Sequence, residues 1–491
     1  MQTGLMAAEQ TEREDKYDVS LDFVVPALGD LVPDQGREDI DTIRLDSVYF
    51  DTADRDLLRH HLTLRRRSGD DDLGWQLKVP AGDARTEVRL PPTGDESVPD
   101  ELANAVSGVA LGKPLLRVAS LSTVRRRHRV VDSSGNSLAE LADDSVRATA
   151  TAHNGGAIAS QWREVEVELG EHGQERLLRD IGGRLVRSGA HTSSYASKLA
   201  RALALEPHRA DDDSENPARR ALTDYLGTQI DEIVAGDVWL RRGLDPIHAT
   251  RVAIRRFRST LRVFKDLVDP DARSRLEDEL VWYAGLLGDV RDRQVQRHRL
   301  GELVAGLPVE LVMGPVAARI EQDLLGEQQR CLTVVMSALD DARYRDLLVT
   351  LAQWRTAPPL TIEPGAGPKV IAKAVKRAGR KARKRLTAAV ADSDATELHR
   401  ARKAAKRARY AAELATPLLG GKAEKKVSEF KHVQKVLGEH QDSVLAADNL
   451  RALGARAGVT EGENGFTFGL LYALELENAR QARADAAHLV K

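Results

Sequence analysis

The sequence predicts a multi-domain α and β protein, with an N-terminal antiparallel β-barrel followed by a C-terminal all-α bundle. A chain of 491 residues has the length of roughly two to four domains. Residues 1–206 carry 26 basic and 35 acidic side chains, whereas residues 217–491 carry 46 and 36. Short alternating segments fill the first part and long helical periodicities fill the second, so the two parts differ in both charge and structure.

The composition narrows the class of protein. The hydrophobic fraction of 42% is sufficient for a packed core in each domain. Cys331 is the single cysteine, which excludes a disulfide framework and disfavours a cysteine-ligated zinc site. The first ten residues carry no secretion signal, and Glu310, Pro308 and Pro315 interrupt the most apolar stretch, at 303–318. We therefore expect a soluble, cytoplasmic protein without a membrane partner.

The N-terminal half shows short strands with one charged face, separated by turn sequences such as those at 91–94 and 133–136. Charged residues recur with the two-residue period of a strand, so each set projects to one side. The sets are Glu12, Glu14 and Lys16; Arg65 and Arg67; Glu87 and Arg89; Arg125, Arg127 and Arg129; Glu164, Glu166 and Glu168. Each set alone is typical of the solvent face of a sandwich. Five of them, some basic and some acidic, favour a barrel whose interior holds both kinds.

Such an interior predicts a particular chemistry. Carboxylates would hold divalent cations, and an oxygen-only ligand set suits Mg²⁺ or Mn²⁺. The basic strands would hold a polyanion whose charge the cations neutralise. The sequence contains no G-x-x-x-x-G-K-[ST] loop, which argues against a P-loop NTPase.

The same residues resemble a known family. The segment TEREDKYDV carries the ExExK signature of the CYTH superfamily, the triphosphate tunnel metalloenzymes. VYFDTADRDL, LTLRRR, WQLKVP, TEVRL, TVRRRHRV, LAELADD, EVEVEL and SSYASKLARAL follow in the family's order. The resemblance implies a domain at 9–206 that folds as an eight-stranded antiparallel barrel and hydrolyses triphosphates with a divalent metal.

The resemblance also implies roles for individual residues. Metal ligands are expected among the acidic strands, at Glu12, Glu14, Glu164, Glu166 and Glu168, with one of the last three spare. Triphosphate ligands are expected at Lys16, Arg65, Arg67, Lys78, Arg125, Arg127 and Lys198. Catalytic roles are expected for Lys16 and for Asp143 or Asp144, one of which would lie beside the attacking water. Glu87 is expected to be an interior partner of the arginines, and Arg126 and Arg129 are expected on the outer face.

A polar, acidic segment at 207–216 is expected to link the two domains. Beyond it, residues 217–491 predict helices near 217–235, 246–268, 272–300, 310–338, 368–391, 395–416, 422–453 and 465–488. Residues 245–267 align with 396–418 at an offset of 151, and 286–295 align with 436–445 at an offset of 150. This internal repeat predicts two four-helix units.

Each copy of the repeat carries a basic stripe on one helix face. The stripes contain His248, Arg251, Arg255, Arg258 and Arg262 in the first copy, and His399, Arg402, Lys406 and Arg409 in the second. A merely solvated face would ordinarily pair such bases with acids at i±4, but residues 251–265 contain no acid. The stripes therefore favour anion binding.

These repeated helices resemble the CHAD domain, a conserved-histidine α-helical module often fused behind a CYTH domain. The second copy departs at Gln441, where the first has Arg291. The resemblance implies a basic channel that binds inorganic polyphosphate, with the two histidines as phosphate contacts or as buried hydrogen-bonding groups. Nucleic acid is the competing ligand, but an aromatic content of 4% supplies few stacking platforms for single strands.

The sequence thus predicts a Mg²⁺- or Mn²⁺-dependent triphosphatase, with inorganic triphosphate as the favoured substrate, joined to a polyphosphate-binding module. The alternatives are a thiamine or nucleoside triphosphatase, an adenylate cyclase, and a non-catalytic polyphosphate-binding scaffold. The pattern predicts no particular oligomeric state.

Overall fold

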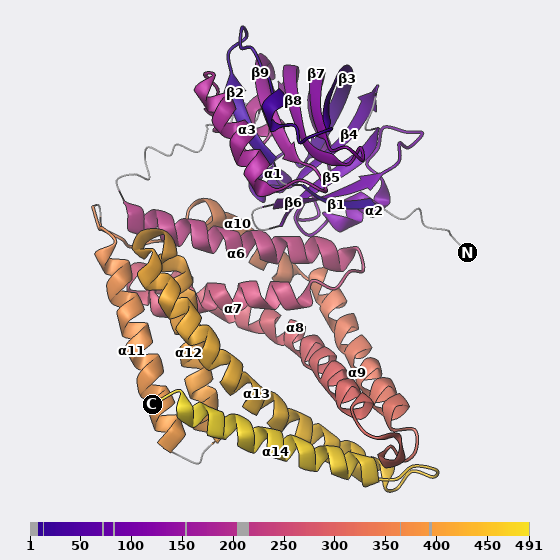
Figure 1. The fold of residues 1–491 in the computed structure, drawn as a ribbon, viewed down its shortest axis with the longest axis vertical. Coiled ribbons are helices and arrows are strands. Elements are labelled where there is room, and N and C mark those ends of the chain that lie inside the picture. Colours follow the sequence, from indigo (N-terminus) through magenta and orange to yellow (C-terminus); the bar gives the residue numbers. More distant parts are fainter. Residues whose placement is uncertain are drawn as a thin grey trace. The chain divides into compact units, whose positions relative to one another are not determined.

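The computed structural model describes residues 8–12, 14–70, 73–81, 84–152, 155–203, 216–363, 365–391 and 395–490. The chain divides into two compact units. One comprises Met1–Asp212 with Asp237–Leu244, and the other comprises Asp213–Gly236 with Asp245–Lys491. Strands dominate the first unit and helices dominate the second (Figure 1).

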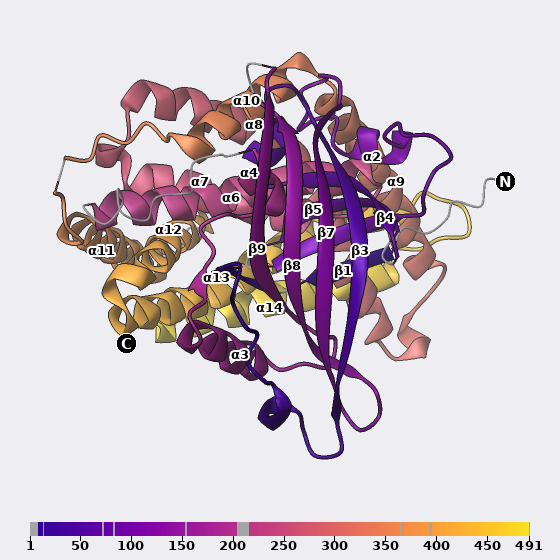
Figure 2. The ribbon, with the colours of Figure 1, turned by 90° about the horizontal axis from the view of Figure 1, so that it is seen from above.

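The first unit is built around one antiparallel sheet of ten strands, nine of which are longer than two residues. Its order is β1-β6-β5-β4-β3-β7-β8-β9-β2-β10. The long strands β3, β7, β8 and β9 lie side by side (Figure 2). The strands are β1 (Ala8–Glu12), β2 (Glu14–Val19), β3 (Arg37–Asp51), β4 (Thr63–Gly69), β5 (Gly74–Ala81), β6 (Ala84–Leu90), β7 (Leu116–Val131), β8 (Ser137–Thr151), β9 (Ala157–Leu169) and β10 (His191–Thr192). The helices are η1 (Gly29–Leu31), α1 (Asp56–Arg59), α2 (Asp100–Ala105), α3 (Glu175–Arg187) and α4 (Lys198–Ala202).

Chain continuity closes this sheet into a barrel. β1 pairs with β6 at one end of the strand order, and β2 pairs with β9 near the other. Since β1 ends at Glu12 and β2 begins at Glu14, the two ends of the sheet are consecutive pieces of one chain. The barrel is thus confirmed, but the strand count of eight is wrong: the expected first strand is divided into β1 and β2, and the short β10 adds to β2.

The outer face of the barrel is apolar where α3 covers it. Val165 and Val167 of β9 are fully buried against Ile181 and Leu185 of α3. Because successive strand residues point to opposite faces, the glutamates that alternate with these valines face the interior. This packing shows that the charged faces of the strands line the barrel interior and are not the solvent faces of a sandwich.

Helix α4 closes one end of that interior. Val146 lies two residues after Asp144 on β8, and Trp162 lies two residues before Glu164 on β9, so both share the interior face. They form an apolar cluster with Leu199 of α4. The side chain of Ser197 caps α4 by accepting a hydrogen bond from the Ala200 amide (3.1 Å).

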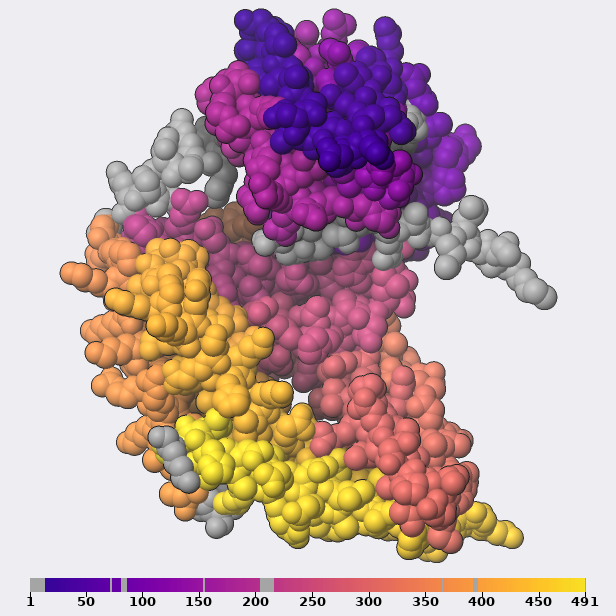
Figure 3. Space-filling model, viewed as in Figure 1, coloured from indigo at the N-terminus to yellow at the C-terminus, as the bar shows by residue number. Residues whose placement is uncertain are grey.

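The second unit contains nine helices of 15 residues or more in its described part. They are α6 (Pro217–Arg241), α7 (Ile247–Val263), α8 (Pro270–Ala305), α9 (Val316–Leu339), α10 (Ala342–Thr356), α11 (Lys369–Ala391), α12 (Ala395–Leu419), α13 (Gly421–Ala457) and α14 (Phe466–His488), with short η2 (Lys265–Leu267) and η3 (Val309–Leu311). Figure 3 shows a narrow opening within this unit, between the salmon α8 and α9 and the gold and yellow α13 and α14.

The two copies of the repeat are visible in matching ion pairs. Arg251 of α7 lies 3.7 Å from Asp292 of α8, and Arg402 of α12 lies 3.8 Å from Asp442 of α13. The copies differ in helix number, because α10 has no counterpart after α14 in the described chain. The sequence analysis does not predict α10, although its buried Tyr344, Leu347, Leu348, Leu351 and Trp354 follow a helical period.

Candidate functional site: a charged cavity in the barrel and a basic face in the helical unit

Strand register sets the interior charges of the barrel opposite one another. Lys16 of β2 lies opposite Glu166 of β9. Arg125 of β7 lies opposite Asp144 of β8, which in turn lies opposite Glu164 of β9. The first two pairs join opposite charges, which attract, whereas Asp144 and Glu164 are like charges that Lys198 bridges. The pairing that builds the barrel thus also assembles the site.

Lys16, Arg125 and Glu166 line a cavity of about 70 Å³. Its cations are Lys16, Arg65, Arg67, Lys78, Arg89, Arg125 and Lys198, and its carboxylates are Glu14, Glu87, Glu166 and Glu168. A second cavity of about 430 Å³ shares Arg67, Arg89, Arg125 and Glu168 with the first and adds Arg127 and Glu140. The two cavities are therefore consecutive parts of one interior space. Six of the seven expected triphosphate ligands line the first cavity, and Arg127 lines the second.

Three buried carboxylates lie beside the first cavity. One oxygen from each of Asp144, Glu164 and Glu166 lies within 4.8 Å of the others. The Lys198 ammonium lies 3.0 Å from Asp144, 2.7 Å from Glu164 and 2.7 Å from Glu166. Lys16 lies 2.6 Å from Glu166, and Arg125 bridges Asp144 (2.7 Å) and Glu166 (3.0 Å).

The cations favour the ionised forms of Glu166 and Asp144. Burial raises the pKa of Glu166, but Lys16, Lys198 and Arg125 outweigh it and hold that pKa well below the ordinary value. The pKa of Asp144 is likewise lowered, because Arg125 and Lys198 overcome its burial. Burial lowers the pKa of Lys198, but the three carboxylates raise it above its usual value overall. Asp144 and Glu166 therefore stay charged at neutral pH.

Two other carboxylates of the cavity behave differently. Burial raises the pKa of Glu168, and Glu14 and Glu140 add to the effect, while Lys78 opposes it. Burial also raises the pKa of Glu140, although Arg125 and Arg127 favour its ionised form. Burial thus disfavours the charged forms of both carboxylates, and a bound cation would favour them.

The donor set of the cluster fits a hard divalent cation. All three candidate ligands are carboxylates, and Mg²⁺ and Mn²⁺ bind oxygen ligands of this kind. Their charge is already balanced in part by Lys198 and Arg125, so a divalent ion on these oxygens competes with the ammonium of Lys198. The cluster combines two expected metal ligands, Glu164 and Glu166, with Asp144, which the resemblance assigns to the attacking water.

The remaining expected metal ligands lie elsewhere. Glu14 faces the cavity and lies 3.2 Å from Lys16, and Glu168 lines both cavities. Neither joins the cluster of three within the described residues. Glu12 occupies the strand position opposite Arg85, and its side chain lies outside the described residues.

Asp143 does not lie with the other candidates. It accepts two hydrogen bonds from Arg163 (2.8 and 2.7 Å), whose guanidinium also donates to the carbonyl oxygens of Leu21 and Phe23. This structural pairing turns Asp143 away from Asp144, as expected for neighbours on a strand. The expectation for Arg129 is also wrong: it donates to Asp41 (3.0 Å), the carboxylate that Arg127 contacts at 2.7 Å. Arg126 is exposed, as expected.

The structure adds residues that the sequence analysis does not assign to the site. Arg89 lines both cavities and lies 3.1 Å from Glu87. Its position two residues after Glu87 places it on the same strand face, and this spacing could have predicted its role. Gln76 accepts from Arg65 (2.6 Å), and Tyr49 accepts from Arg65 (3.2 Å). Glu87 lies 3.3 Å from Lys78, so it is an interior partner of basic residues, as expected.

In the helical unit, α7 and α12 bring the two basic stripes together. Arg255 donates to the hydroxyl of Tyr410 (3.2 Å), and Arg256 donates to Glu413 (3.1 Å). Lys406 is half-buried beside the arginines of both stripes. Burial, followed by Arg402 and Arg255, lowers the pKa of Lys406 to about 7. The lowered pKa indicates that nearby acids do not fully neutralise this group of positive charges.

The two histidines have different surroundings. His399 Nδ1 lies 3.0 Å from Oε1 of Gln441, within hydrogen-bonding distance. Burial lowers the pKa of His248, and Arg291 and Arg255 lower it further. The difference between Arg291 and Gln441 in the two copies thus falls beside the histidines. Four stripe members are paired with acids. Arg251 and Arg402 form the ion pairs with Asp292 and Asp442, Arg262 donates to Glu277, and Arg409 donates to Glu413 (2.8 Å). Arg258 has a buried Nε without a hydrogen-bond partner among the described atoms.

Comparisons with known proteins agree with this division of the chain. The model of the CYTH domain matches residues 25–189, and that of the CHAD domain matches residues 224–451. The uncharacterized proteins MT2285 and Rv2226, from two strains of Mycobacterium tuberculosis, are each 34% identical over 507 residues, covering 97% of this chain and 95% of the relative. No described helix is long and apolar enough to cross a membrane.

Solved structures resemble parts of the chain. PptA from Streptomyces chartreusis is 21% identical with a TM-score of 0.46, covering 55% of this chain and 98% of that protein. The CHAD domain from the plant Ricinus communis is 24% identical with a TM-score of 0.41, covering 54% of this chain and 91% of that domain.

Proposed function

Since the chain belongs to the family in which a CYTH domain is followed by a CHAD domain, we propose that its first unit is a metal-dependent triphosphatase and its second a polyphosphate-binding module. We propose inorganic triphosphate as the substrate and Mg²⁺ or Mn²⁺ as the cofactor. One observation supports the proposal above all: a cavity with seven cations adjoins a cluster of three buried carboxylates.

The cations of the cavity suit a triphosphate. Fully ionised triphosphate carries about five negative charges, and phosphoryl transfer spreads charge over the equatorial oxygens of the transferred group. Guanidinium groups present paired donors to phosphate oxygens, which gives Arg65, Arg67 and Arg125 both charge and direction. Lys16, Lys78, Arg127 and Lys198 supply the remaining proposed contacts. A charge-neutral substrate would gain nothing from this arrangement.

We propose that Asp144, Glu164 and Glu166 hold the divalent ion, with Glu14 and Glu168, and with Glu12 as a further candidate. The bound ion supplies positive charge to the phosphoryl oxygens and lowers the pKa of water. Asp144 is the proposed acceptor of a hydrogen bond from the attacking water, because it faces the interior whereas Asp143 is bound to Arg163. Lys16 pairs with Glu166 and reaches the same cavity, where it orients the substrate.

The helical unit supports the second half of the proposal. Its two stripes approach each other at Arg255 and Lys406, and long-chain polyphosphate supplies the regular negative charge that such a face lacks. Proposed contacts are His248, Arg251, Arg255, Arg258, Arg262, His399, Arg402, Lys406 and Arg409. A bare phosphate chain needs no aromatic stacking, in contrast to single-stranded nucleic acid.

The test is the release of phosphate from inorganic triphosphate, thiamine triphosphate and ATP by the whole protein, with Mg²⁺, with Mn²⁺ and after chelation. We expect metal-dependent release that is fastest from inorganic triphosphate. Formation of cyclic AMP from ATP would instead identify a cyclase. Binding of polyphosphate without any metal-dependent release would identify a scaffold and refute the enzymatic part.

A further inference from the structure

A second basic groove lies in the helical unit, between α7, α11 and α12. Its volume is about 280 Å³. Five cations line it: Arg262, Lys265, Arg377, Lys381 and Arg407. In contrast to the barrel cavity, small apolar side chains form the rest of its wall, including three alanines.

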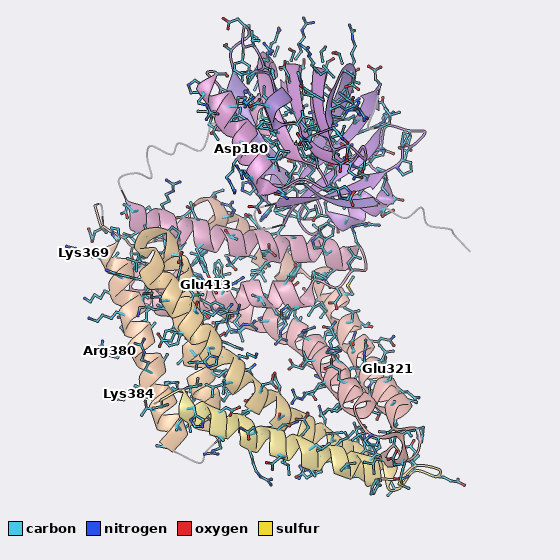
Figure 4. All side chains as sticks on the ribbon, in the orientation of Figure 1. Asp180, Glu321, Lys369, Arg380, Lys384 and Glu413 are labelled. Atoms are coloured by element: carbon cyan, nitrogen blue, oxygen red, sulfur yellow. The ribbon has the colours of Figure 1, made fainter. Side chains whose placement is uncertain are left out.

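The internal repeat relates this groove to a second position in the helical unit, and the two positions carry different charges. In one half, Glu413 of α12 accepts hydrogen bonds from Arg256 (3.1 Å), Arg409 (2.8 Å) and the hydroxyl of Tyr225 (3.3 Å). In that half, the protein's own carboxylate therefore neutralises the arginines, and the tyrosine hydroxyl donates to the same carboxylate. Glu413 is labelled on α12 in Figure 4.

The repeat offset of 151 residues relates Arg256 to Arg407 and Glu413 to Arg262. In the other half, an arginine thus stands where the first half has the glutamate. Burial lowers the pKa of Arg407, and Arg262 and Arg385 lower it further. The second half places two arginines together where the first half has an ion pair.

Acids compensate this charge only in part. Arg262 donates to Glu277, and Arg377 lies 3.0 Å from Asp266. No carboxylate of the described residues lies within ion-pair distance of Arg407 or Lys381. Other cations continue along α11, where Arg380 and Lys384 lie at its outer side (Figure 4). The groove therefore has an excess of positive charge, partly buried, which an anion would relieve.

We propose that this groove binds a small organic phosphate, that is, a phosphate ester with at least two negative charges and an apolar body of nucleoside size. The cations bind the phosphate, and the wall formed by Ala374, Ala378, Ala404 and Val263 buries the apolar body. An inorganic phosphate chain gains nothing from such a wall. The volume is just below the roughly 300 Å³ at which ordinary ligand pockets begin, which limits the ligand to a small molecule.

The site shares Arg262 with the proposed polyphosphate face, but its other lining residues are distinct from that face. Arg407 follows Lys406 on α12, and consecutive helical residues diverge by about 100°. Lys406 lies near Arg255 and Arg402, whereas Arg407 lies near Arg262 and Arg385. The inference does not depend on the proposed enzymatic activity, because it rests on the helical unit alone.

The test is calorimetric titration of the whole protein with AMP, inorganic phosphate and adenosine. AMP and inorganic phosphate have similar charge, so their comparison isolates the apolar body. We expect AMP to bind at least tenfold more tightly than phosphate, and adenosine not to bind measurably. Equal affinities for AMP and phosphate would overturn the proposal.

Three variants locate the binding. Arg407→Gln should weaken AMP binding at least tenfold, whereas Lys406→Gln, one position away on the other face, should leave it unchanged. Ala378→Leu fills the groove at a half-buried position and should abolish AMP binding while sparing that of inorganic phosphate. Circular dichroism checks that each variant is folded. Wild-type affinity for AMP in folded Arg407→Gln, or an equal loss in Lys406→Gln, would refute this location.

Discussion

The ammonium group of Lys198 lies 2.7 Å from the carboxylate of Glu166, and the same group contacts Glu164 and Asp144. The lysine comes from α4, which packs against the interior face of the barrel at one end. The helix thus inserts a fixed positive charge into the proposed metal cluster. Without a divalent ion, this charge is part of what permits three buried carboxylates to lie together.

Replacement of Lys198 by Met should therefore make the protein dependent on the metal for stability. Breaking a buried ion pair on one side costs about 3–5 kcal/mol, so we expect the melting temperature without metal to fall by several degrees. Mg²⁺ should recover more of this loss than it adds to the wild type, because binding to the native state stabilises it. Scanning calorimetry with and without Mg²⁺ provides the measurement.

Lys113→Met is the matched control. Lys113 also bridges two carboxylates, Asp54 and Asp56, each at 2.8 Å, but it is 37% exposed and does not line the cavity. Its loss should cost less stability and should not change the response to Mg²⁺. An unchanged melting temperature and Mg²⁺ response in Lys198→Met would show that Lys198 does not stabilise the cluster.

A pair of neighbouring aspartates tests which strand face performs catalysis. Asp144→Asn removes one charge from the cluster at nearly constant volume, so metal-dependent turnover should fall by about two decades or more. Asp143→Asn disrupts the contacts with Arg163 on the opposite face, so it should lower stability but leave the kcat of the folded protein within a few-fold of wild type. Similar losses of kcat in both variants would contradict the assignment.

This pair also shows what the sequence could and could not predict. The two-residue period identified the shared faces of Arg65 and Arg67 and of Glu164 and Glu166, because side-chain direction is a local property of strands. It could not decide between Asp143 and Asp144, since the choice depends on the pairing of Asp144 with Arg125, 19 residues earlier in the chain. Register between strands is set by long-range packing, here by α3 on the outer valines.

The helical unit gives a parallel case. The repeat was visible in the sequence because both copies keep a histidine, several cations and an acid at corresponding positions. The approach of Arg255 to Tyr410 and of Arg256 to Glu413 was not visible, because helix pairing depends on packing between segments about 155 residues apart. The alignment sets Arg262 in the first copy against Glu413 in the second. The consequence of this difference is visible only in the structure, where Arg262 lies near Arg407, the counterpart of Arg256.

Polyphosphate binding should weaken as the pH rises from 6 to 8. The pKa of Lys406 is about 7 without ligand, so the side chain loses its proton above this pH. Binding of a polyanion favours the ammonium form and must then take up a proton, which lowers the affinity by at most about tenfold per pH unit. Titration at several pH values, by fluorescence or calorimetry, measures the slope.

Lys406→Arg is the control for this pH dependence. Arginine keeps the positive charge across the whole range, so the variant should bind more uniformly between pH 6 and 8. The terminal phosphates titrate equally in both experiments, and the difference between the two slopes therefore belongs to Lys406. Identical slopes would remove Lys406 from the binding site.

Reversal of two central charges should separate binding from hydrolysis. Arg255→Glu with Lys406→Glu changes the net charge by four units where the stripes meet, while the apolar faces of α7 and α12 stay intact. Long-chain polyphosphate binding should collapse, and in the wild type it should weaken steeply with salt, as expected when counterions are released. Triphosphate turnover should stay near normal, because its proposed ligands belong to the barrel.

The control reverses the exposed Arg451 and Arg480, an equal change in net charge that should reduce binding far less. Tight binding by the double variant at moderate salt would place the polyanion elsewhere.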